Sequence, residues 1–237
     1  MKKVILSLFT LTALTLTALT TPAKASIITA IDNTTLIPND GISFTSRAEA
    51  IVFQTGPNSA SIDRLTFKFQ TAGSSLGTFA AYLYAVDATN MPTGAPLASQ
   101  TGMAFTLPGP AGYYNATYTG AAIANLSSVT MLAGQKYALA LTNKNGGQLW
   151  WSDKYGSSIG DYTTGDGYSV LSVAESLSGG PWLQSSNNYM MKLETGPATT
   201  VPEPSTYALL CISLGVMGYA RKRMTKNEVQ SLSEVEG

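Results

Sequence analysis

The chain has 237 residues, of which 44% are hydrophobic and only 12% are charged, which suits one globular domain with targeting segments rather than an ordinary cytosolic protein. It has no histidine and one cysteine, Cys211, so the commonest general base and metal ligand is missing and residues 26–200 cannot form a disulfide. Residues 26–200 contain seven basic and ten acidic residues without a basic run, which argues against nucleic acid as a partner.

The first 25 residues have the order of a secretory signal peptide. Lysines at positions 2 and 3 precede an apolar run over residues 4–19, and the small-residue site Ala-Lys-Ala follows at residues 23–25. This order predicts export by Sec-type machinery and cleavage between Ala25 and Ser26. The alternative is an uncleaved membrane anchor, which the threonines in the apolar run disfavour because hydroxyl groups weaken insertion.

Short segments with period-2 hydrophobicity dominate the middle of the chain, and turn formers separate them. In residues 65–69 the odd positions are apolar and the even ones polar, as in a strand with one buried face. The longer apolar run over residues 79–86 suits a central strand covered on both faces. Turns are expected at residues 56–58, 91–94, 108–110 and 145–147. Further strands are predicted at residues 42–44, 51–53, 103–107, 113–118, 137–141, 148–152, 168–173 and 189–193.

This pattern predicts an all-β fold, an antiparallel β-sandwich of jelly-roll type, over residues 26–195. The runs Ser61–Leu65, Tyr82–Asp87, Pro92–Ala98 and Leu132–Tyr137, in that order, resemble the choice-of-anchor R domain. The resemblance covers roughly residues 40–195 and implies an extracellular β-rich module without an assigned activity. A flexible linker is expected at residues 196–200.

Aromatic residues are densest between positions 150 and 182. Trp150 and Trp151 are adjacent, so on a strand they must point to opposite faces, and Trp182 follows later. All three can be packing residues. The alternative is a carbohydrate-binding site that uses Trp150 or Trp151 together with Trp182, since sugars present flat C–H faces that pack on aromatic rings.

The acidic residues of the same region allow two further interpretations. Asp161 and Asp166 lie in a loop with two glycines and could bind calcium, although a β-turn explains the loop equally well. A glycoside hydrolase would need a carboxylate pair from the set Asp153, Asp161, Asp166 and Glu175. No pattern pairs these residues, so we predict a protein without catalytic residues and without a required cofactor.

The C-terminal region combines three features. Val201, Pro202, Glu203, Pro204, Ser205 and Thr206 come first, then 14 mostly apolar residues (207–220), then Arg221, Lys222 and Arg223. The apolar stretch would span about 21 Å as a helix, which is short for a hydrocarbon core of about 30 Å. Such a segment could be a plain membrane anchor or part of a sorting signal. In either case the basic cluster would keep the C-terminal end in the cytoplasm.

The three features together resemble the PEP-CTERM sorting signal of Gram-negative bacteria over residues 201–223. The resemblance implies a short transmembrane helix, transient anchoring in the inner membrane, and removal of the tail by an exosortase. Residues 224–237 extend beyond the usual end of such signals and are expected to form a disordered tail. The resemblance also implies an association with exopolysaccharide and biofilm, so we expect a structural or interaction protein of the cell surface or extracellular matrix. Carbohydrate binding is the second hypothesis and hydrolysis the third.

Overall fold

The computed structural model describes residues 26–38, 40–42, 46–107, 109–146, 149–155 and 159–197. In this part of the chain the strands pair antiparallel and form two sheets, so the predicted antiparallel β-sandwich is confirmed. The expected signal peptide, the sorting signal with its helix at 201–223 and the tail at 224–237 lie outside the described residues. Among the residues described, no helix is long and apolar enough to cross a bilayer.

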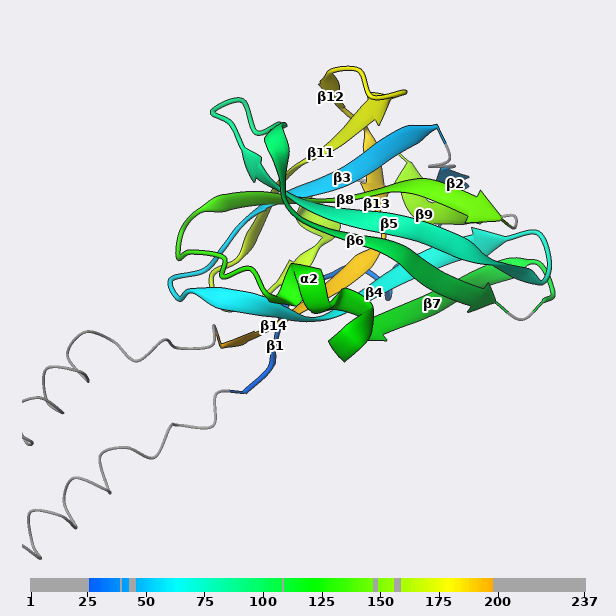
Figure 1. Ribbon diagram of the computed structural model, residues 1–237, viewed down its shortest axis with the longest axis horizontal. Coiled ribbons are helices and arrows are strands. Elements are labelled where there is room, and N and C mark those ends of the chain that lie inside the picture. Colours follow the sequence, from blue (N-terminus) through cyan, green and yellow to red (C-terminus); the bar gives the residue numbers. More distant parts are fainter. Residues whose placement is uncertain are drawn as a thin grey trace, which may run out of the picture. The chain divides into compact units, whose positions relative to one another are not determined.

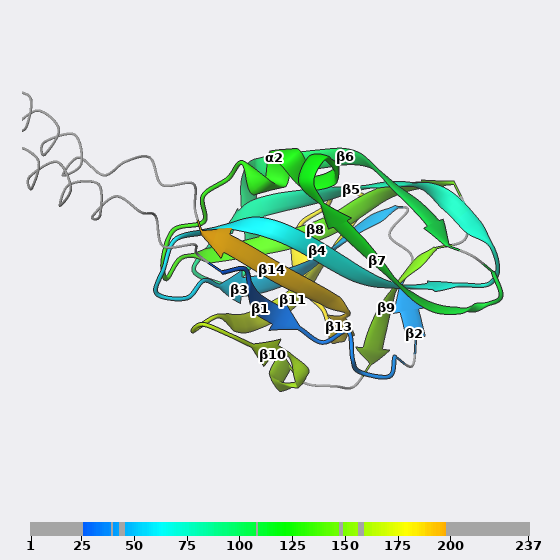
Figure 2. The ribbon, with the colours of Figure 1, turned by 90° about the horizontal axis from the view of Figure 1, so that it is seen from below.

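One sheet has eight strands (Figure 2). Its main path is β10 (Thr163–Thr164), β1 (Ile28–Asp32), β14 (Met191–Pro197), β4 (Ala60–Thr71), β9 (Trp150–Tyr155) and β13 (Asn187–Tyr189). Off this path, β2 (Asp40–Ile42) pairs with β9 and β7 (Gly112–Thr119) pairs with β4. The first and last strands of the domain are neighbours, with Ile28 opposite Thr195.

The other sheet has six strands, four of which lie side by side across the view in Figure 1. The order is β12 (Trp182–Gln184), β11 (Ser169–Leu177), β3 (Arg47–Gln54), β8 (Lys136–Gly146), β5 (Ser75–Val86) and β6 (Pro92–Leu107). Successive strands β3, β4 and β5 alternate between the two sheets, as do β7, β8 and β9. Such repeated crossing is typical of jelly rolls.

The inner faces of the two sheets enclose one hydrophobic core. Phe67 lies near its centre, with its ring 5.7 Å from that of Trp151 and 5.9 Å from that of Phe79 on the opposite sheet. Both contacts are edge-to-face, the arrangement that aromatic quadrupoles favour. The odd positions of the predicted strand at 65–69 are all buried in this core, as the alternation required.

Three short helical segments connect the strands: η1 (Gly120–Ile123), α2 (Ala124–Ser127) and η2 (Ile159–Asp161). The first two place Ile123 and Leu126 into the core beside the sheets. They are too short to define a layer of their own, and they close one side of the sandwich near β6.

Several boundaries differ from the sequence-based expectation; β8, for example, runs to Gly146, inside the turn expected at 145–147. The turn expected at 91–94 lies earlier, because Asp87 Oδ1 accepts hydrogen bonds from the backbone N–H groups of Thr89 and Met91, and β6 already begins at Pro92. Proline is tolerated at the first residue of an edge strand, where its missing N–H leaves no ladder bond unmade. At the other end, β14 runs to Pro197, two residues into the segment expected as a linker.

Candidate functional site

The three tryptophans occupy different environments. Trp151 is fully buried in the core, where its ring stacks 4.9 Å from that of Tyr189 and its Nε1 donates to the Met190 carbonyl at 2.8 Å. Trp150 is half-buried on the opposite side of β9 in the eight-stranded sheet, whereas Trp182 is half-buried on β12 of the six-stranded sheet. Trp150 and Trp182 therefore belong to different sheets, and Trp151 has no surface to offer a ligand.

Trp182 lies instead on a groove over the outer face of the six-stranded sheet. One wall is the β11–β12 hairpin, with Ser178, Gly179 and Gly180 in its turn. The other wall is the start of β6, where the pairing with β5 is interrupted between Thr93 and Ala98 and the chain bulges outward. Figure 1 shows both features rising above the sheet. The hollow between them has a volume of about 620 Å³.

Small side chains form the floor beneath these walls. The residues on the outer face of β3, β8 and β11 that pack together without exposure are Ala50, Val52, Ala138, Ala140 and Ala174. Tyr84, Met91 and Trp182 cover them from above. Ala48 and Thr142 continue the floor into the open part of the groove.

The aromatic rings of the groove come from opposite ends of the sheet. Three strands separate β12 from β5, so on a flat sheet their axes would be roughly 19 Å apart. The ring centroids of Trp182 and Tyr84 are nevertheless 5.8 Å apart, with an angle of 70° between the planes. Tyr82 extends the row, at 6.1 Å from Tyr84. The hairpin therefore bends over the alanine floor, and the small floor residues are what allow this approach.

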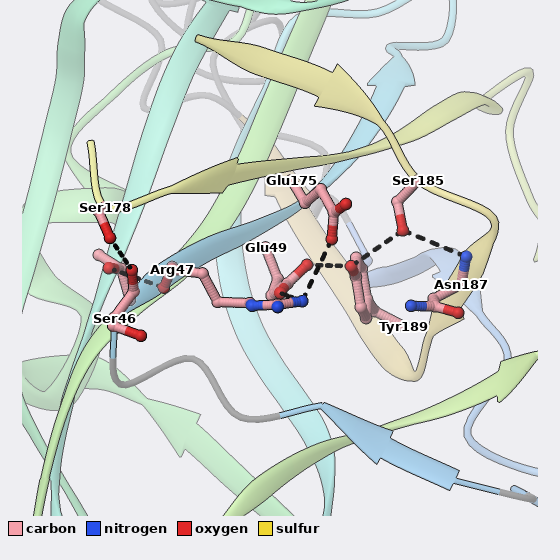
Figure 3. Close-up of polar contacts among 9 residues, drawn as sticks. Ser46, Arg47, Glu49, Glu175, Ser178, Ser185, Asn187 and Tyr189 are labelled. Carbon is pink, nitrogen blue, oxygen red and sulfur yellow. Dashed lines mark hydrogen bonds and ion pairs between the residues drawn. The ribbon is translucent and has the colours of Figure 1, made fainter. Parts of the chain in front are cut away.

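A cluster of charged residues lies on the core-facing side of the same sheet, around the start of β3 (Figure 3). Arg47 Nη1 is 3.3 Å from Glu175 Oε2 and 3.6 Å from Glu49 Oε1. The Tyr189 hydroxyl donates a hydrogen bond to Glu49 Oε2 and is itself 3.2 Å from Ser185 Oγ. Arg47 and Glu49 share the odd positions of β3 with the core residues Ile51 and Phe53, so the Arg47 side chain lies on the core side of the sheet and not on the outer face that carries the groove.

Burial decides the protonation of that carboxyl group. The Glu49 side chain is fully buried, and this desolvation raises its pKa to about 7, against the opposing effects of the Tyr189 hydrogen bond and the Arg47 charge. The folded protein therefore keeps a proton on this carboxyl group to a higher pH than an exposed glutamate would. The Glu49 side chain has no exposed surface to offer a ligand.

The four acidic residues considered for hydrolysis are placed separately. Glu175 pairs with Arg47, and Asp153 is buried on β9, where desolvation and then the Asp40 charge raise its pKa to about 6. Asp161 ends the short helix η2. Asp166 occupies a turn with φ 50°.

The loop considered for calcium contains a two-residue turn. Asp166 and Gly167 have φ values of 50° and 74°, and the Tyr168 N–H donates to the Gly165 carbonyl at 3.0 Å. Two central residues with positive φ define a type I′ turn, for which Asp-Gly is a favoured pair. In the described part of the chain no three acidic, histidine or cysteine side chains come together to hold a metal ion.

Sequence reasoning missed the two tyrosines of the groove. Tyr82 and Tyr84 lie at the even positions of the apolar run at 79–86, which predicted a strand covered on both faces. A signal was present in the facing strand, where the outward positions of residues 137–141 are alanines. A row of small residues opposite large aromatic ones indicates that other side chains cover that face of the sheet.

Comparison with known proteins identifies the C-terminal segment. Residues 200–223 match the PEP-CTERM protein-sorting motif, so the sorting motif predicted from the sequence is confirmed. The motif indicates an exosortase-targeted protein that is exported to the cell envelope or surface. A search of curated proteins finds no match.

Two solved structures resemble the sandwich at low similarity. One comprises the cysteine protease and lectin-like domains of Cwp84, a surface-layer-associated protein of Clostridium difficile, with 13% identity and a TM-score of 0.39 over 74% of this chain. The other is a clostridial Cwp84 cysteine protease after propeptide cleavage, with 13% identity and a TM-score of 0.41 over 74% of this chain. The matches span 36% and 41% of those two chains, less than two thirds of either.

Proposed function

We propose that this protein is a non-enzymatic interaction protein of the cell surface or extracellular matrix, exported through Sec-type machinery and processed by an exosortase. The observation that carries the proposal is the sorting motif at residues 200–223, directly after the last strand of the sandwich. The signal-peptide pattern at residues 1–25 supports translocation of the domain between the two segments.

The distribution of acidic residues supports a role without catalysis. Glycoside hydrolysis needs two carboxyl groups on either side of one scissile bond. Glu175 is held by Arg47 at 3.3 Å, and the neighbouring carboxyl group of Glu49 is buried behind it. Asp153 is buried in the other sheet. None of these arrangements leaves a facing pair open to a substrate.

The resemblance of the C-terminal signal supports a place in a polysaccharide-rich matrix of a Gram-negative bacterium, since such signals accompany exopolysaccharide production. The composition fits this setting, because only 12% of the residues are charged. A surface with few charges has little electrostatic attraction for nucleic acid and leaves recognition to hydrogen bonds and aromatic contacts.

Processing is tested by expressing the full chain in a Gram-negative host with an exosortase and in the same strain lacking that enzyme. We expect a surface form without the basic C-terminal end in the first strain and a membrane-bound form that retains it in the second. Intact-mass measurement of both fractions distinguishes the two forms.

A matched pair of variants makes the test specific. Exchange of both prolines of the motif (Pro202→Ala with Pro204→Ala) should leave the untrimmed form in the membrane of the exosortase strain. Ser231→Ala, in the segment after the basic cluster, should be processed normally. Identical masses in the two strains would refute exosortase processing.

The non-enzymatic part has its own test. The surface form is incubated with soluble polysaccharides, and the release of reducing ends is measured over time. We expect no release above the buffer control. Release that Glu175→Gln abolishes would establish a hydrolase and overturn this part of the proposal.

A further inference from the structure

The groove over the six-stranded sheet has the shape of a ligand site. It is bounded by the β11–β12 hairpin and by the bulge of β6, and its volume of about 620 Å³ falls within the range of pockets that hold small ligands. The hairpin wall is held in place by backbone bonds, since the Gly180 N–H donates to the Leu177 carbonyl at 2.8 Å and the Ser178 N–H donates to the Ser46 carbonyl at 2.9 Å. The groove is therefore formed before a ligand arrives.

Its aromatic lining suits flat apolar surfaces. Trp182, Tyr84 and Tyr82 form a continuous row along the groove, and each side chain is only half-buried. The face of an aromatic ring carries partial negative charge, and the C–H groups on one face of a pyranose ring carry partial positive charge. Stacking of a sugar on these rings would remove apolar area from water while its hydroxyl groups stay at the edges.

Polar groups lie where those hydroxyl groups would reach. Ser46 and Ser178 lie together at one end of the groove (Figure 3), and Thr142 is on the floor. The hydroxyl groups of Ser178 and Thr142 donate to the carbonyls of Ser46 and Arg47, so both can accept a hydrogen bond from a sugar hydroxyl group.

The charge of the groove points to an uncharged ligand. Arg47 is the only charged residue among the described residues that line it, and its side chain lies on the core side of the sheet. Its guanidinium is already matched by Glu175 at 3.3 Å and by Glu49 at 3.6 Å. The described lining therefore offers an acidic sugar no unmatched positive charge, whereas a neutral sugar needs none.

A peptide fits this surface less well. Extended peptides gain affinity by hydrogen bonding to the open edge of a sheet. The groove instead lies over a sheet face, and the backbone groups of β3, β8 and β11 beneath it are engaged by neighbouring strands.

We propose that the groove formed by Trp182, Tyr84 and Tyr82 over the outer face of the six-stranded sheet binds neutral sugar units of an extracellular polysaccharide. The inference rests on the proposed function, since it assigns the interaction of the surface protein to one site. Of the three tryptophans considered from the sequence, the proposed site contains only Trp182. Tyr82 and Tyr84 of β5 take the place of Trp150 and Trp151.

The test is affinity electrophoresis of the surface form in gels containing dextran, a soluble β-glucan or alginate. We expect at least one of the two neutral polysaccharides to retard the protein and alginate to leave its mobility unchanged. Trp182→Ala and Tyr84→Ala should each weaken retardation about tenfold, because each removes a stacking surface. The control Leu183→Ala changes an exposed apolar side chain of the same strand and should bind normally.

Several outcomes would overturn the inference: no retardation by either neutral polysaccharide, equal retardation of Trp182→Ala and the wild type, or retardation by alginate alone. A dimer in light scattering that Trp182→Ala dissociates would assign the groove to a second copy of the chain instead.

The circular dichroism spectrum of each variant shows whether the sandwich is intact, and Tyr84→Ala provides the result if Trp182→Ala is unfolded. Export and tail removal are measured on the same variants, so a failure of sugar binding with normal processing refutes the site and leaves the proposed function intact.

Discussion

The two outer faces of the sandwich are built from different kinds of side chain. On the eight-stranded sheet, Glu194 Oε2 is 3.4 Å from Arg64 Nη1 and Glu194 Oε1 is 3.2 Å from Lys192 Nζ. Thr66 and Thr117 share a hydrogen bond of 2.9 Å on the neighbouring strands. On the six-stranded sheet the packed centre of the outer face is formed by four alanines and one valine, all without exposure.

The difference shows that a sheet face can be buried without a second sheet above it. Polar cross-strand pairs suffice where water covers the face. Where the β11–β12 hairpin and Tyr84 fold over the face, only small residues leave room for them. The six-stranded sheet thus has two packed faces, one toward the common core and one beneath the aromatic row, and the second is the one that carries the groove.

The largest expected effect contrasts a tryptophan of the core with that of the groove. Trp151→Ala should lower the free energy of unfolding by about 3–5 kcal/mol, since it leaves a large cavity between Phe67 and Tyr189. Trp182→Ala should cost about 1 kcal/mol, because the side chain is already half in water. Urea denaturation followed by circular dichroism measures both, and equal losses would mean that the outer layer is as essential to the fold as the core.

A second expectation concerns the buried acids, one in each sheet. The pKa of Glu49 is raised from 4.5 to about 7 and that of Asp153 from 3.8 to about 6, both by burial first. Between the unfolded and the folded pKa of each residue, its carboxyl group is ionised in the unfolded chain and protonated in the folded chain. Folding therefore takes up protons, and the free energy of unfolding falls as the pH rises. Glu49 alone should reduce the free energy of unfolding by roughly 3 kcal/mol between pH 4.5 and pH 8.

Amide variants separate the two contributions. Glu49→Gln keeps an acceptor for the Tyr189 hydroxyl but cannot ionise, so it should remove the decline above pH 6. Asp153→Asn should make the decline between about pH 4 and 6 shallower, because only Glu49 then contributes to it, and should leave the decline above pH 6 intact. A wild-type stability that rises steadily from pH 5 to pH 8 would contradict the sign of both shifts.

How much of this the sequence could reveal depends on the range of the interactions. Alternation at residues 65–69 predicted a strand because the side-chain period of two is local, and β4 confirms it. A turn at Asp166-Gly167 could be proposed beside calcium binding for the same reason, because the backbone preferences of Asp and Gly are local. The burial of Glu49 depends on Tyr189, 140 residues further along the chain, and nothing near residue 49 signals it.

The groove shows the same limit. Trp182 could be selected as one of three tryptophans in the aromatic-rich region, but its neighbour Tyr84 is almost a hundred residues away and separated by three strands of the sheet. Periodicity predicts which residues share a face of one strand. It does not predict that a hairpin folds over that face, because this depends on the twist and bending of the whole sheet.

The alanine floor can be tested by enlargement. Ala140 lies between Ala50 and Tyr82 across three adjacent strands, without exposure. Ala140→Leu should cost about 1–3 kcal/mol, since added methyl groups must push the covering residues away. The matched change on the other outer face, Arg64→Leu, should stay within about 0.5 kcal/mol because its ion pair is partly exposed. Equal effects on the two faces would show that the aromatic row does not rest on the floor.

The smallest expected effect comes from two turns at the ends of β11. Ser178 and Gly179 have φ values of 50° and 75°, and Asp166 and Gly167 have 50° and 74°, so both turns are of type I′. Asp tolerates positive φ better than Ser, because its carboxylate can bond to the nearby backbone. Ser178→Asp should therefore raise the free energy of unfolding by about 0.5 kcal/mol and Asp166→Ser should lower it by about the same amount. Thermal denaturation of the two single variants and of the double exchange measures these changes.

Unchanged stability of the double variant would show that both turns follow the same local backbone preference. A loss of stability confined to Ser178→Asp would instead show that the new carboxylate disturbs the Ser46 carbonyl, which accepts a hydrogen bond from the Ser178 N–H.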